Sequence, residues 1–110
     1  MIATAEGRYI RISPRKIRQV LDLIRGKDVL VAEAILLNIN KRPKEPLIKI
    51  LRSAIANAKQ KGFMPQQLWI SKAICNVGPM WKRYKAAAFG RATPILRRTS
   101  HVRIELELKA

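Results

Sequence analysis

The chain has 110 residues, 48% of them hydrophobic, so it can form one domain with a core and is too apolar for a disordered tail. Its 23 Lys and Arg residues against 7 Asp and Glu residues give a formal net charge of +16. Such an excess repels itself in a compact fold unless a polyanion binds, so nucleic acid is the partner that the composition indicates first.

The same composition excludes several classes of protein. The single cysteine, Cys75, cannot form an internal disulfide, and no run of ~18 apolar residues could span a bilayer. The first residues lack the basic and apolar regions of a secretory signal. One histidine and seven scattered acids give no spacing typical of a metal site or an acid–base pair. We therefore expect no membrane span, no metal, no cofactor and no enzymatic activity.

The first quarter of the chain predicts a short strand followed by a helix. Residues 8–12 alternate as a strand does, with Ile10 and Ile12 on one face. Ser13 is expected to cap free amides at the start of the helix, and Pro14 suits its first turn. Gly26 is the expected stop. The apolar stripe of this helix has i, i+3, i+4, i+7 spacing and consists of Ile17, Val20, Leu21 and Ile24.

Two further helices are predicted before the spacing of apolar residues changes from helical to strand-like. The first runs over residues 31–38 and is expected to bury Val31, Ile35 and Leu36. The second follows a proline-containing connector and ends at Gly62. Its small residues Ala54 and Ala58 would allow another element to approach closely. The complete stripe of this helix is Leu47, Ile50, Leu51, Ala54, Ile55 and Ala58.

Past residue 67 the apolar period becomes two, which is typical of strands. Leu68, Ile70, Lys72 and Ile74 alternate with Trp69, Ser71, Ala73 and Cys75. Near the C-terminus the residues expected to face inward are Val102, Ile104, Leu106 and Leu108. We predict that these two strands pair antiparallel under the helices. The expected fold is α+β, a small antiparallel sheet of three strands packed on three helices, with a long extended β-hairpin.

The segment between these two strands carries the predicted function. Residues 46–104 contain twelve Lys or Arg and no carboxylate, which indicates a large anionic surface as partner. A compact hairpin needs two to five connecting residues, whereas residues 79–98 are about twenty. We predict a ribbon with arms reaching ~30 Å and a turn near residues 88–90. The alternative is a flexible surface loop whose aromatic residues fold back on the core.

The candidate RNA-binding residues fall into three groups. Basic residues of the hairpin would meet phosphates, namely Lys82, Arg83, Lys85, Arg91, Arg97 and Arg98. The aromatic residues Trp81, Tyr84 and Phe89 would stack on bases or pack against sugars, and Gly90 would allow the turn or a close approach of the backbone to a ligand. On the body, Arg11 precedes the first helix, and the helix face opposite the apolar stripe is cationic, with Arg15, Lys16, Arg18 and Arg25.

Ordered motifs over nearly the whole chain resemble one family. They are SPRKIR at 13–18, LIRGK at 23–27, SAIANA at 53–58, GP at 78–79 with KR at 82–83, GRA at 90–92 and RRTSH at 97–101. Together they are similar to the universal large-subunit ribosomal protein L-twenty-two family. Members of that family usually carry Pro-Arg and a small or basic residue where this chain has Ala86, Ala87 and Phe89, so its tip is less charged.

The resemblance implies a role that composition alone does not give. A member of the family would be a structural constituent of the large ribosomal subunit that binds its ribosomal RNA early in assembly. The resemblance implies that the arm entering the RNA carries Met80, Trp81, Lys82 and Arg83, with Gly90 and Arg91 at or near the tip. It also implies that the first helix is presented to RNA by Ser13, Arg15, Lys16, Arg18 and Arg25. Its hairpin would line the nascent-peptide exit tunnel, so the expected partners are ribosomal RNA, neighbouring ribosomal proteins and the nascent peptide in transit. We expect a single domain over 1–110, with a body of residues 1–78 and 99–110 and a hairpin of residues 79–98. The expected location is a cytoplasmic or organellar ribosome, without membrane association or a homo-oligomer.

Three other classes of protein fit the sequence less well. A DNA-binding or transcription-regulating module would need a helix-turn-helix or a dimerising heptad, and neither is evident. A cationic membrane-surface protein would need a wide lipid-facing apolar side, whereas the helical stripes are narrow enough to be covered by the strands. An enzyme would need a nucleophile–base pair, a phosphate-binding glycine loop or metal spacing, and the sequence contains none of these.

Overall fold

A computed structural model describes residues 2–78, 81–86, 92–97 and 99–109, with the backbone alone for 81–86 and 92–97. The elements are β1 (Ala3–Ile10), α1 (Pro14–Ile24), α2 (Val29–Asn38), α3 (Lys44–Gln60), a 3-10 turn η1 (Pro65–Gln67), β2 (Leu68–Val77), β3 (Trp81–Ala86), β4 (Ala92–Arg97) and β5 (Ser100–Leu108). An antiparallel sheet has the order β1-β5-β2, and β3 pairs with β4 in a second sheet. The predicted α+β class and three-helix, three-strand body are confirmed.

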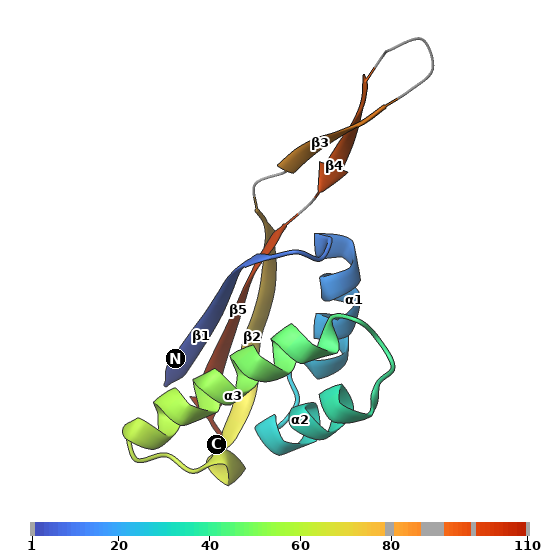
Figure 1. Cartoon of the computed structure of the whole chain (residues 1–110). Coiled ribbons are helices and arrows are strands. Elements are labelled where there is room, and N and C mark those ends of the chain that lie inside the picture. The colour runs from blue at the N-terminus through green and yellow to red at the C-terminus, as the bar shows by residue number, and fades with distance from the viewer. Residues whose placement is uncertain (1, 79–80, 87–91, 98, 110) are drawn as a thin grey trace.

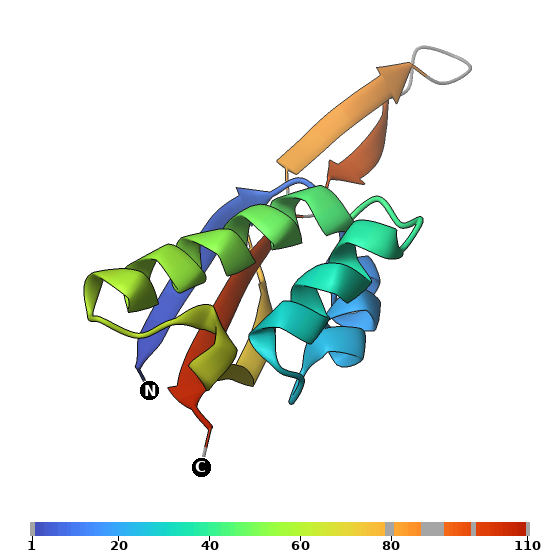
Figure 2. The same cartoon turned by 90° about the horizontal axis from the view of Figure 1, so that it is seen from below.

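The molecule is elongated because β3 and β4 project from one end of the body (Figure 1). Its radius of gyration is 17.0 Å and its extents are 64 × 25 × 17 Å, whereas a compact domain of this length would have a radius near 13 Å. Figure 2 shows both chain ends together at the opposite end of the body. The ribbon therefore points away from the termini.

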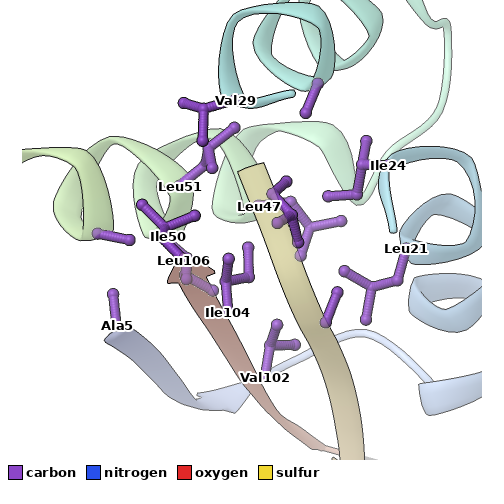
Figure 3. Packing of buried hydrophobic residues seen from close by; sticks show 14 of the residues in the cluster. Ala5, Leu21, Ile24, Val29, Leu47, Ile50, Leu51, Val102, Ile104 and Leu106 are labelled. Carbon is purple, nitrogen blue, oxygen red and sulfur yellow. The ribbon is translucent and has the colours of Figure 1, made fainter. Parts of the chain in front are cut away.

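The core lies between the three-stranded sheet and the helices (Figure 3). The predicted stripe of α1 is fully buried, and α3 buries every residue of its predicted stripe. From the central strand β5, Val102, Ile104 and Leu106 point into the same space. Leu108 was expected there too, but it is 40% exposed because it lies at the end of the strand. Ala54 and Ala58 are fully buried, and α3 packs closely on β1.

Two element predictions were wrong at their boundaries or faces. The first strand covers Ala3–Ile10 instead of 8–12, because the small residues at its start pair with β5, beginning with Ala3 opposite Leu106. Helix α2 covers Val29–Asn38 and buries Val29, Ala32 and Leu36, while Val31 is 47% exposed. The sequence VLVAEAILLN has apolar residues on every side of the helix, so its periodicity could not select the buried face.

A β-bulge at Ser71 corrects the predicted alternation of β2. The register places Ile70 opposite Leu106 and Lys72 opposite Glu105, so Ser71 is the extra residue. Beyond it, Ala73 and Cys75 face the core, while Lys72 and Ile74 face solvent. The bulge keeps the Lys72 ammonium out of the core, where strict alternation from Ile70 would have placed it.

Side chains of two helices cover the outer edges of the sheet. On the edge of β2, Arg18 donates two hydrogen bonds to the Cys75 carbonyl at 3.2 and 2.9 Å. Arg25 does the same for the Ala73 carbonyl at 3.2 and 2.7 Å. On the edge of β1, Asn57 of α3 donates to the Thr4 carbonyl at 2.9 Å. Lys61, the residue after α3, donates to the carbonyl of Ile2, the residue before β1, at 2.6 Å. These contacts occupy edge carbonyls that could otherwise pair with another strand.

Deletion of Ser71 is expected to preserve the fold, because it removes the bulge and leaves Ala73 and Cys75 facing the core. The deletion removes the hydrogen bond from the Ser71 hydroxyl to the Glu105 carbonyl. This should lower the free energy of unfolding by about 0.5–1.5 kcal/mol. Deletion of Ile74 instead reverses the face of every later residue of β2 and should cost roughly 2–4 kcal/mol. Urea denaturation measures both; equal losses would contradict the assignment of the bulge.

The two edge arginines should contribute to stability through the geometry of their guanidinium groups. Arg18→Lys and Arg25→Lys keep the charge but cannot donate two bonds to one carbonyl. We expect each to lower the free energy of unfolding by about 0.5–1.5 kcal/mol, at the low end because these side chains are partly exposed. Arg15→Lys, on the same helix and facing solvent, is the matched control and should change stability little. Equal stability of all three variants would refute the edge contacts.

Candidate nucleic-acid interface

The start of α1 presents cations to solvent next to the origin of the hairpin. Ser100, the first residue of β5, donates a hydrogen bond from its hydroxyl to the Ile12 carbonyl at 2.7 Å, which ties this segment to the base of the hairpin. Arg11, Arg15 and Lys16 are exposed around it. Among the described residues, Arg15 and Lys16 have no hydrogen-bond or ion-pair partner. They are therefore available to an external anion.

Ser13 occupies the position before α1, but its side chain makes no capping hydrogen bond, so that prediction was wrong. Its backbone is extended, with ψ of 144°, and the Ser13 carbonyl accepts a bond from the Ile17 amide at 3.3 Å. The hydroxyl of the half-buried Ser13 is left near Arg15 and Lys16 in the sequence. A hydroxyl in this position can contact phosphate or sugar as a donor or an acceptor.

Arg18 and Arg25 lie on the same helix but point to β2. Each guanidinium binds a carbonyl of the edge strand, and Arg25 also forms an ion pair with Asp22. Both are partly exposed, yet their donors are largely used within the chain. The structure thus divides the predicted basic face of α1 into an open part at its start and a part bonded to the sheet.

The body exposes further cations that were not predicted as RNA-binding residues. Lys41 and Arg42 lie in the connection between α2 and α3, and the run KRPK at 41–44 was the available signal. Lys49 and Lys59 are exposed on α3. Arg52 of the same helix pairs with Glu33 at 3.4 Å, so its charge is partly neutralised. The body therefore adds basic surface along α3 to the surface at the start of α1.

The hairpin strands carry the other predicted contacts. In the β3–β4 register Trp81 is opposite Arg97, Arg83 opposite Ile95 and Lys85 opposite Thr93. Lys82 and Tyr84 alternate with these residues along β3, and successive residues of a strand fall on opposite faces. The remaining predicted hairpin residues lie outside the described part of the chain, namely Met80, Phe89, Gly90, Arg91 and Arg98.

The sheet face turned away from the core is nearly neutral. Glu6 lies 3.4 Å from Arg8 and 3.3 Å from Arg103. Glu105 in turn lies 3.2 Å from Arg103 and 3.9 Å from Lys72. Carboxylates in these pairs offset the arginines and lysine and would repel phosphates. Among the described side chains, uncompensated positive charge therefore lies at the start of α1, with Arg15 and Lys16, and on α3, with Lys49 and Lys59.

The chain offers little for catalysis in its described part. Burial raises the pKa of the Cys75 thiol, and a hydrogen bond with Ser100 and the charge of Arg18 offset this only partly. The thiol is therefore a protonated core group at neutral pH. No group of three His, Cys, Asp or Glu residues that could hold a metal occurs among the described residues. None of the helices in the described part of the chain combines the length and the hydropathy of a membrane span.

Comparisons with known proteins show which family the sequence resembles. Residues 5–107 match the sequence model of the family described as Ribosomal protein L22p/L17e. The chain is 46% identical over 110 residues to the large ribosomal subunit protein uL22 of Halothermothrix orenii, across 99% of this chain and 97% of the relative. It is 51% identical over 107 residues to uL22 of Sulfurihydrogenibium sp., across 97% and 92% of the two chains.

A third relative matches from end to end. The large ribosomal subunit protein uL22 of Clostridium novyi is 45% identical over 111 residues and is covered completely, as is this chain. The family consists of structural ribosomal proteins and not of enzymes. Because the family model and these relatives match nearly all of the sequence, the chain belongs to the Ribosomal protein L22p/L17e family.

Proposed function

We propose that this protein is a structural constituent of the large ribosomal subunit that binds large-subunit ribosomal RNA. The body, residues 1–78 and 99–110, attaches through the start of α1 and the basic surface of α3. The hairpin, residues 79–98, enters folded RNA. Relatives named as large ribosomal subunit proteins support the assignment to that particle. Neighbouring ribosomal proteins are then further partners.

The observation that carries the proposal is the separate β3–β4 ribbon on a chain with a net charge of +16. An isolated two-stranded ribbon is at best marginally stable in water, so a binding partner is needed to hold it. Each arm contains basic residues, including Lys82, Arg83 and Arg97. Folded RNA supplies both the negative charge and the surrounding surface.

The distribution of charge on the body indicates which of its surfaces faces RNA. Arg15 and Lys16 are exposed and uncompensated beside the base of the hairpin, whereas the carboxylates of Glu6 and Glu105 neutralise the open sheet face. Phosphates are attracted to the first surface and not to the second. We therefore place the start of α1 against RNA and the ion-paired sheet face away from dense phosphate.

The resemblance described above extends the proposal to the role of the hairpin. Its distal end would line the nascent-peptide exit tunnel, and binding of the body would occur early in subunit assembly. Ala86 lies at the end of β3, where members of the family usually carry more charge. A less charged tip would interact with the nascent peptide mainly through its shape.

Salt dependence tests RNA binding by this protein. With an in vitro transcript of large-subunit ribosomal RNA, neutralisation of about eight phosphates predicts a slope of log affinity against log salt of about −6 to −7. The double variant Arg15→Gln/Lys16→Gln should reduce the magnitude of this slope by about 2, because each lost phosphate contact removes about 1. Filter binding from 50 to 300 mM salt (roughly the usable range) measures the slopes.

The matched control removes the same number of charges from ion-paired positions. Lys72 lies 3.9 Å from Glu105 and Lys109 lies 3.1 Å from Asp28. The variant Lys72→Gln/Lys109→Gln should keep the slope of the unmodified protein. A flat salt dependence would overturn RNA binding, and equal slopes for the two double variants would overturn the assigned surface.

A further inference from the structure

Tyr9 has an unusual backbone conformation at the end of β1. Its φ is 56°, and it is the non-glycine residue with positive φ in the described chain. It falls where the β1–β5 register shifts, between Gly7 and Ile10. A bulky side chain rarely adopts the left-handed region, and such strain persists where surrounding contacts hold it, often at binding sites.

His101 of β5 holds Tyr9 in this conformation. The Tyr9 amide donates a hydrogen bond to His101 Nδ1 at 3.1 Å. The two rings meet edge to face, with centroids 4.9 Å apart and planes at 90°. Tyr9 is nevertheless 57% exposed. A perpendicular contact of this kind leaves at least one face of the tyrosine ring open for stacking.

His101, which contacts Tyr9, also lines a pocket. It has a volume of about 270 Å³ and is lined by Glu6, Arg8, Asn76, His101, Val102 and Arg103. Pockets for drug-sized ligands range from roughly 300 to 1,000 Å³, so this one suits a smaller group. Its walls offer both donors and acceptors, through the Asn76 amide, the arginines and the Glu6 carboxylate.

The charges around the pocket favour a neutral ligand over a phosphate. Glu6 forms ion pairs with Arg8 at 3.4 Å and with Arg103 at 3.3 Å, so both guanidinium groups already face a carboxylate. A phosphate placed here would be repelled by the same carboxylate. A nucleobase is neutral, flat and carries donors and acceptors along its edge, which matches both the pocket and the open tyrosine ring.

The pocket also lies where RNA would be. Ser100 pairs with Ile10 of β1 and with Val77 of β2, and the Gly78 amide donates to the Thr99 carbonyl at 2.9 Å where the hairpin leaves the body. His101 and Asn76 are opposite one another directly below this point. RNA surrounding the base of the hairpin would therefore pass beside Tyr9.

We propose that Tyr9 and this pocket bind one unpaired nucleobase of the RNA. The base stacks on the open face of Tyr9, and its edge meets the polar side chains of Glu6, Arg8 and Asn76. This inference rests on the proposed RNA binding and adds a contact that reads a base, whereas the cations of α1 and the hairpin contact phosphates.

A pair of substitutions at Tyr9 tests the stacking. Tyr9→Asn removes the ring, keeps the backbone amide that binds His101, and suits positive φ, because asparagine tolerates the left-handed region. Loss of one stacked base should weaken binding of the large-subunit ribosomal RNA transcript by about 5- to 140-fold. The salt slope should stay unchanged, because stacking releases no counterions. Tyr9→Phe keeps the ring and should bind within a factor of about two of the unmodified protein.

The outcomes separate this site from RNA binding itself. If Tyr9→Asn binds as tightly as Tyr9→Phe while both keep a steep salt slope, the nucleobase site is wrong and RNA binding stands. If the unmodified protein shows no salt-dependent affinity, the proposed function fails, and the site fails with it. Thermal unfolding of both variants is measured alongside to compare their stability.

A measurement on the unmodified protein covers the case in which Tyr9→Asn does not fold. The probes are hexaadenylate and a hexamer with the same phosphates and sugars but no bases. Stacking should shift the Tyr9 ring proton resonances upfield with hexaadenylate and leave them nearly unchanged with the abasic hexamer. Equal shifts with the two probes, or no shift with either, would overturn the proposal.

Discussion

The antiparallel pairing of β2 with β5 holds the body together and decides where the hairpin leaves it. These strands are joined through β3 and β4, and their register runs from Leu68 opposite Leu108 to Val77 opposite Ser100. The chain therefore leaves the sheet after Val77 and returns to it at Ser100 at the same end of the sheet. The termini lie at the other end (Figure 2). The position of the ribbon is thus a consequence of strand pairing in the core.

The chain uses its many cations in three different ways. Arg18, Arg25 and Lys61 bind edge carbonyls of the sheet. Others, such as Arg103, pair with carboxylates on the open sheet face. Arg15 and Lys16 remain uncompensated at the start of α1. A strongly basic composition indicates a polyanionic partner, but the partners of each side chain decide which cations are free to meet it.

The proposed interface combines charge with a specific shape. Phosphate contacts by exposed cations position a protein on RNA without selecting a sequence, whereas stacking and base-edge contacts add selectivity. Tyr9 belongs to the second kind of contact, and its strained backbone is held by His101 at 3.1 Å. Both kinds of contact converge at the base of the hairpin, because β1, β2 and β5 meet there.

The candidate site was predictable only in part. Arg15 and Lys16 were selected from their place in an amphipathic helix, and both are exposed and uncompensated. Arg18 and Arg25 were predicted from the same helix face, but their carbonyl partners are 57 and 48 residues away in the sequence. Tyr9 was not predicted as a binding residue, because neither its positive φ nor its contact with His101 follows from neighbouring residues.

Local periodicity by itself determined the α+β class, the buried faces of α1 and α3, and the apolar side of β5 up to Leu106. In each case one stripe is clearly apolar, so only one face can be buried. Tertiary packing decided the buried face of α2, which has apolar residues on every side, and the bulge at Ser71, which keeps Lys72 in solvent. Tertiary packing also decided which arginines bind the edge carbonyls of β2. These features depend on contacts between residues distant in sequence, and a local pattern cannot predict such contacts.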